Sequence, residues 1–90
     1  MTRLHVLVRG RVQGVGFRWF VRERASALRV TGWVQNRSDG AVEVVAEGPA
    51  EAIEQLRRHL ERGPEGANVS AVDDLGDVEG KLPASFTILR

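Results

Sequence analysis

The sequence predicts an α+β domain in which two helices cover one face of an antiparallel sheet of four to five strands. Strand-like segments, whose apolar residues fall at every second position, are interrupted by two segments with helical spacing. A glycine-rich turn joins the first strand to the first helix. An Asp-Gly pair marks the tip of a hairpin. We expect these elements to form a single domain over residues 1–90.

The first strand and the first helix have clear apolar faces. A strand is expected over residues 3–9, where Leu4, Val6 and Val8 alternate with other residues. A helix is expected from position 17 to about position 28 or 29. Its apolar face consists of Phe17, Phe20, Val21, Ala25 and Leu28. We expect residues 22–24 to lie mostly on the opposite face.

The remaining segments complete the sheet and add the second helix. Strands are expected over residues 30–36 and 41–47, joined by a turn at Asp39-Gly40. A helix over residues 49–62 follows, with a stripe of Ile53, Leu56 and Leu60. A weaker strand over residues 69–75, a polar loop over residues 76–83 and a short strand over residues 85–89 end the chain.

This order of elements predicts a ferredoxin-like split βαβ sandwich. A strand-helix-strand crossover is right-handed and makes the first and second strands parallel. Parallel strands end at the same edge of a sheet, so we expect Asn36 to lie near the glycine-rich turn. Asn36 shares its side of the strand with Val34, which predicts that its amide faces the helices. Asn36 could instead simply begin the turn, a common use of Asn.

The glycine-rich turn over residues 10–18 has the composition of an anion site. Three glycines in seven residues, Gly10, Gly14 and Gly16, let the backbone aim several N–H groups into one concavity. The helix that follows adds free N–H groups and its dipole. Arg18 lies in the first helical turn, where a cation is unfavourable unless an anion is bound nearby. The alternative is an ordinary surface turn with a solvated arginine.

Composition limits the class of protein. The chain has 42% hydrophobic and 28% charged residues and a formal net charge of +1. Charge therefore gives no sign of a nucleic-acid or membrane partner. The absence of cysteine excludes disulfides, thiolate catalysis and cysteine-bound metals. No apolar stretch approaches the length of a signal peptide or a membrane span, so we expect a cytoplasmic protein.

Two motifs resemble the acylphosphatase family. The first is Gly10-Arg11-Val12-Gln13-Gly14-Val15-Gly16-Phe17-Arg18, and the second runs from Gly32 to Val42 with Gly48 further on. The resemblance covers almost the whole chain and implies residue roles. Arg18 would bind a phosphoryl group and Asn36 would orient the attacking water. The surrounding backbone amides would come from Gln13, Gly14, Val15, Gly16, Phe17 and Arg18.

The resemblance also implies an activity and a set of partners. The family hydrolyses acyl phosphates, which are carboxylic-phosphoric mixed anhydrides, to a carboxylate and inorganic phosphate. It does so without a metal or cofactor. We accordingly expect a small-molecule acyl phosphate as substrate and inorganic phosphate or a similar anion as product or inhibitor. We expect a monomer that binds neither nucleic acid nor membrane.

Rival nucleotide and RNA motifs fit less well. The turn lacks the third glycine of a dinucleotide fingerprint and the lysine of a P-loop. An RNA-recognition module has the same order of elements. However, Val15 and Arg18 replace residues of its strand signature, and the chain has few aromatics for stacking. A regulatory anion-binding domain, or an acylphosphatase-like domain of a larger maturation enzyme, is a further alternative.

The two histidines, the late acidic residues and the two tryptophans are the other candidate functional residues. His5 and His59 are expected to be exposed or hydrogen-bonded rather than metal ligands. Acidic residues between positions 73 and 79 are expected to form a solvated edge. Trp19 and Trp33 lie off the main apolar faces and could cover the open side of the sheet or the site.

Overall fold

The computed structural model describes residues 1–89 and contains five strands and two helices within that range. The strands are β1 (Thr2–Arg11), β2 (Thr31–Asn36), β3 (Val42–Gly48), β4 (Asn68–Asp74) and β5 (Thr87–Ile88). The helices are α1 (Phe17–Ala27) and α2 (Ala50–Arg62). Each predicted element is present, with bounds that differ from the predicted ones by only a few residues.

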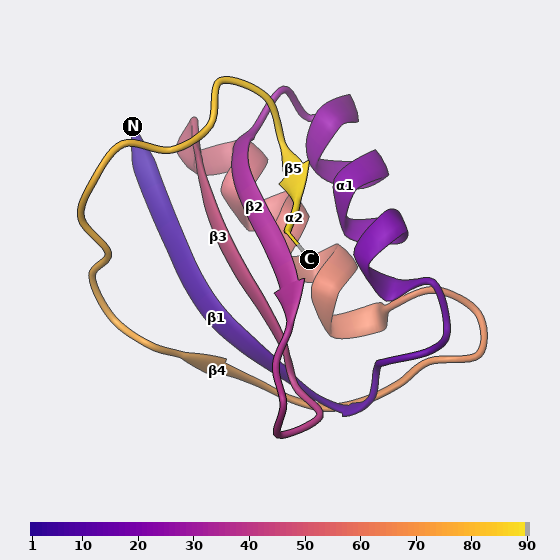
Figure 1. The fold of residues 1–90 in the computed structure, drawn as a ribbon. Helices are drawn as coiled ribbons and strands as arrows, with labels where there is room; N and C mark the ends of the chain where they lie inside the picture. The colour runs from indigo at the N-terminus through magenta and orange to yellow at the C-terminus, as the bar shows by residue number, and fades with distance from the viewer. Residues whose placement is uncertain (90) are drawn as a thin grey trace.

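The sheet has the strand order β4-β1-β3-β2-β5. β3 pairs antiparallel with both β1 and β2, so β1 and β2 run in the same direction, as predicted. Both helices cover one face of the sheet (Figure 1). The predicted ferredoxin-like α+β fold is therefore confirmed. The turn after β1 and the end of β2 lie at the same edge of the sheet.

β5 corrects the prediction of a purely antiparallel sheet, because it pairs parallel to β2 and makes the sheet mixed. The direction follows from the path of the chain. β4 runs antiparallel to β1, and its last residue pairs with Val6, so the chain leaves β4 heading toward the end of the sheet where β1 and β2 begin. The segment 75–86 then crosses that end of the molecule to the far edge of the sheet (Figure 1). β5 consequently starts beside the start of β2 and must run the same way.

The core lies between the sheet and the helices. The predicted stripes of α1 and α2 are buried there, while Phe20 and Leu28 are partly buried against it. The sheet contributes alternate residues of β1 and β3, in agreement with the predicted period of two. The buried cluster consists of Leu4, Val6, Val8, Val12, Phe17, Val21, Ala25, Val30, Val34, Val42, Val44, Ala46, Ile53, Leu56, Leu60 and Phe86.

The other face of the sheet is also covered, by a hydrogen-bonded charge network centred on the buried Glu43. Its carboxylate accepts hydrogen bonds from His5 Nε2 (2.6 Å), Gln35 Nε2 (3.0 Å) and Arg37 Nη1 (3.2 Å). Burial alone would raise the pKa of Glu43, but these three donors more than offset it, so the pKa lies below its usual value. The predicted hydrogen-bonded histidine is confirmed at His5.

The acidic residues between positions 73 and 79 are exposed, as predicted, and two of them form ion pairs. Asp73 pairs with Arg9 at 2.8 Å and Asp74 pairs with Arg57. Within residues 1–89, no group of three His, Asp or Glu side chains is arranged to hold a metal ion. Neither of the helices described is long and apolar enough to cross a membrane.

Gly32 provides a test of the β2–β3 pairing that positions the end of β2. Its φ is +135°, and a Cβ there would lie 2.0 Å from the Val45 carbonyl oxygen. We expect Gly32→Ala to lower the free energy of unfolding by about 3 kcal/mol or more. Gly40→Ala is the matched control, because Gly40 also has a positive φ, +94°, but open space around it. Its expected loss is about 1–2 kcal/mol. Equal losses in urea unfolding would contradict the close approach at Gly32.

Candidate active site

The turn between β1 and α1 depends on two glycines with left-handed backbones. Gly14 and Gly16 have φ values of 76° and 77°. A Cβ at either position would meet nothing within 4 Å, so the backbone conformation rather than space requires glycine. Alternation of left-handed and ordinary conformations turns successive N–H groups toward one side. The turn thus has the backbone form of a small anion-binding cradle.

The start of α1 is uncapped. Gly16 is the N-cap residue, no side chain within residues 1–89 caps the helix, and the first turn contains no acidic residue. The hydrogen bond from Phe20 N to Gly16 O (3.0 Å) closes the first turn, so the amides of residues 17–19 precede the intrahelical ladder. These amides and the helix dipole give this end of α1 a partial positive charge that a bound anion would stabilise.

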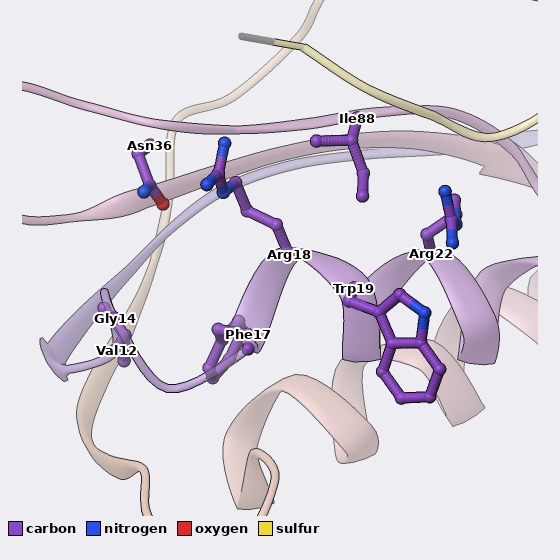
Figure 2. Close-up of a pocket in the computed structure, with 9 residues that line it drawn as sticks. Val12, Gly14, Phe17, Arg18, Trp19, Arg22, Asn36 and Ile88 are labelled. Atoms are coloured by element: carbon purple, nitrogen blue, oxygen red, sulfur yellow. The ribbon is translucent and has the colours of Figure 1, made fainter.

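Arg18 and Asn36 meet in one pocket, although they come from different elements. Arg18 is half-buried on the first turn of α1, and Asn36 is exposed at the end of β2. Figure 2 shows the Arg18 guanidinium extended toward Asn36 across the mouth of the glycine-rich turn. The pocket has a volume of about 390 Å³. It is lined by Val12, Gly14, Gly16, Phe17, Arg18, Trp19, Arg22, Asn36 and Ile88.

Most of the residues predicted for the site line this pocket, but two do not. Gly14, Gly16, Phe17, Arg18 and Asn36 are among the lining residues. Val15 instead packs its half-buried side chain against the hydrophobic core.

Gln13 is the second exception. Its side chain leaves the cradle and points to the β2–β3 hairpin. Its Nε2 donates to the carbonyl oxygens of Arg37 (2.8 Å) and Ala41 (3.0 Å). One amide group therefore fastens the glycine-rich turn to the hairpin that follows Asn36. The sequence predicted only a backbone-amide contribution from Gln13. The side-chain role depends on a contact across 24 and 28 residues of sequence.

Three residues that line the pocket, Val12, Arg22 and Ile88, were not among the predicted site residues. Arg22 was placed on the solvent face of α1, but it is half-buried and lies in the pocket. Its position four residues after Arg18 is the signal that could have found it, because residues i and i+4 share a helix face. Ile88 comes from β5, whose pairing no local pattern predicts. Trp19 was predicted to cover either the sheet or the site, and it lines the site with 58% of its surface exposed.

The pocket is positively charged. None of its lining residues within the described part of the chain is acidic, and two are arginines. Neither His5 nor His59 lines it. His59 packs edge-on against Phe20 at a ring distance of 6.3 Å. Burial, followed by the nearby Arg24 and Arg62, lowers the pKa of His59. The arrangement can bind an anion but offers no acid–base pair.

Comparison of the chain with known proteins identifies its family. A family model described as acylphosphatase matches residues 4–88. The chain belongs to the acylphosphatase family. It is 53% identical over 73 residues to an acylphosphatase of Thermus thermophilus, in an alignment that covers 81% of this chain and 83% of that relative.

Solved structures of the family have the same fold. The structure of an acylphosphatase from Coxiella burnetii matches with a TM-score of 0.89 at 43% identity, covering 98% of this chain and 92% of that one. The structure of T. kodakarensis HypF matches with a TM-score of 0.84 at 32% identity, covering 100% of this chain but 12% of that one. A domain similar to this chain thus also occurs as a small part of a much longer chain.

The two hydrogen bonds of Gln13 lead to a test of how the cradle is held. We expect Gln13→Ala to weaken binding of inorganic phosphate by about three- to tenfold, because the turn loses its attachment beside Asn36. Binding can be measured by titration calorimetry. Gln35→Ala is the matched control, since its amide donates to Glu43 on the opposite face of the sheet. Equal effects of the two substitutions on phosphate affinity would contradict a local role for Gln13.

Proposed function

We propose that the protein hydrolyses acyl phosphates to a carboxylate and inorganic phosphate without a metal ion, using Arg18 and Asn36. The observation that carries this proposal is the meeting of a half-buried arginine, an uncapped helix start and a strand-end amide in one pocket. Membership of the acylphosphatase family supports the same chemistry. The acyl phosphate substrate enters from solvent through the open mouth of the pocket.

Arg18 and the backbone amides of Gln13, Gly14, Val15, Gly16, Phe17 and Arg18 hold the phosphoryl group in this proposal. Phosphoryl transfer needs mainly positioning and stabilisation of charge on the equatorial oxygens. A guanidinium can bind two of these oxygens in a fixed, planar geometry, and the amides add donors that do not reorganise during the reaction. A lysine at position 18 would supply charge without that geometry.

Asn36 positions the attacking water. Its neutral amide cannot act as a general base, but it can hold a water by hydrogen bonds in line with the phosphorus–oxygen bond that breaks. An oxygen of the substrate's own phosphate accepts the proton of that water. The leaving group is a carboxylate, which is stable without a proton, so the reaction needs no general acid. The absence of a histidine or carboxylate among the described lining residues agrees with this scheme.

The proposal includes a monomer in the cytoplasm, with inorganic phosphate as product and competitive inhibitor. Its support is that one chain supplies both the cradle and Asn36, so no second copy is needed to complete the site. Size-exclusion chromatography with light scattering tests the oligomeric state.

Hydrolysis of benzoyl phosphate in the presence of EDTA tests the proposed roles. We expect the wild type to turn it over and Arg18→Ala to lose nearly all turnover and most inhibition by phosphate. We expect Asn36→Ala to lose about a hundred- to a thousandfold in kcat while the inhibition constant for phosphate changes only a few-fold. Full activity of Asn36→Ala would contradict the water-positioning role. No turnover by a folded wild type would overturn the proposed enzyme.

The rate should be insensitive to pH across the neutral range. The expected reason is that neither His5 nor His59 lines the pocket and the burial of His59 keeps its pKa low. His59 therefore becomes protonated at a lower pH than an ordinary histidine. A profile of kcat/KM for benzoyl phosphate from pH 6 to 8 checks this. A steep limb in that range would point to a histidine in the mechanism.

A further inference from the structure

The pocket is larger than its phosphate cradle. Its volume of about 390 Å³ is in the range of sites that hold small organic molecules. Gly14, Gly16 and Arg18 line the cradle end, where Asn36 also lies. The wall that continues along α1 is made of Trp19, Arg22 and Ile88. This part of the pocket is available for the acyl group of a substrate whose phosphoryl group occupies the cradle.

Arg22 adds a second cation to that wall. It follows Arg18 by four residues, which is a rise of about 6 Å along the helix. In Figure 2 the two arginine side chains leave the same side of α1, and Ile88 of β5 lies over the helix between them. The pocket therefore runs from one guanidinium to the other along a single helix face.

The charge of Arg22 is poorly compensated within the residues described. Its ion pair joins Nη2 to Oε2 of Glu23 at 3.6 Å, with 39% of the Arg22 side chain and 51% of the Glu23 side chain exposed. Neighbouring positions on a helix do not face each other, and exposed ion pairs contribute little. No described residue that lines the pocket is acidic. An anionic group of a bound substrate could therefore compete for this guanidinium.

We propose that Arg22 binds a second carboxylate on the acyl group, so that the preferred substrates are monoacyl phosphates of dicarboxylic acids. This inference rests on the proposed function. The cradle offers amides and Arg18 for the phosphoryl group, whereas the far end offers one guanidinium fork, which matches a carboxylate. The hydrocarbon between the two anionic groups packs on Ile88 and on the exposed surface of Trp19.

Spacing limits which dicarboxylic acids fit. Because Arg22 follows Arg18 at a rise of about 6 Å along the helix, the second carboxylate should lie at a similar distance from the acyl carbon. A benzene ring with its two carboxyl groups in meta positions meets this requirement and cannot cyclise. The probes are therefore benzoyl phosphate, 3-carboxybenzoyl phosphate and the neutral analogue 3-carbamoylbenzoyl phosphate.

The test compares kcat/KM for the charged probe with kcat/KM for its neutral analogue. We expect this ratio to be about tenfold in the wild type, with the difference mainly in KM, because the second carboxylate is remote from the bond that breaks. Arg22→Gln should reduce the ratio to about one. Arg22→Lys should keep part of it, because the charge is retained without the planar fork.

A matched control separates local binding from the overall field of the protein. Arg58→Gln removes one positive charge from an exposed position of α2 outside the pocket. It should leave the ratio unchanged. Comparing the same ratio among variants also cancels any difference in leaving-group ability between the two probes.

Two outcomes would overturn the inference while leaving the proposed function intact. In the first, the wild type turns over benzoyl phosphate but shows a ratio near one. In the second, Arg22→Gln lowers kcat on all three probes equally and keeps the ratio, which would assign Arg22 to stabilising any leaving carboxylate. No turnover of any probe by folded wild type would overturn the proposed function and this inference together.

Discussion

The candidate site depends on the amides at the start of α1, which no side chain of residues 1–89 caps. Helices usually begin with a Ser, Thr, Asp or Asn whose side chain caps these amides and stabilises the protein by about 1 kcal/mol. Here Gly16 occupies that position and caps nothing. A capping oxygen would fill the place that the phosphoryl group occupies in the proposed mechanism. The chain therefore gives up local stability to keep a preformed cationic end that an anion can satisfy.

The rest of the fold holds this end in place against Asn36. β3 lies between β1 and β2 and sets them parallel, so the turn after β1 and the end of β2 meet at one edge. Gln13 then ties the turn to the hairpin. The end of α2 packs closely on the first residue of α1. A Cβ on Gly63 would lie 3.0 Å from the ring of Phe17. The carboxylate of Glu43 lies on the opposite face of the sheet, where it is held in ion pairs.

Local sequence patterns predicted most of the fold and two central residues of the site. Alternation and helical spacing gave the strands and helices, and the crossover rule brought Asn36 to the glycine-rich turn. What they missed depends on contacts between distant segments. The parallel pairing of β5 follows from the path of residues 75–86. The side-chain hydrogen bonds of Gln13 depend on carbonyl oxygens of the β2–β3 hairpin. Arg22 was misplaced because charged residues were assumed to face solvent, although its spacing from Arg18 indicated a shared face.

The most direct test of the central claim is a titration of isotope-labelled protein with inorganic phosphate, followed by backbone amide chemical shifts. We predict saturable shifts concentrated in the amides of residues 13–19 and in the side-chain amide of Asn36. We also predict that these shifts disappear in Arg18→Ala. Shifts centred elsewhere, or shifts at the glycine-rich turn that persist unchanged in Arg18→Ala, would contradict the claim that Arg18 and the uncapped start of α1 form one anion site.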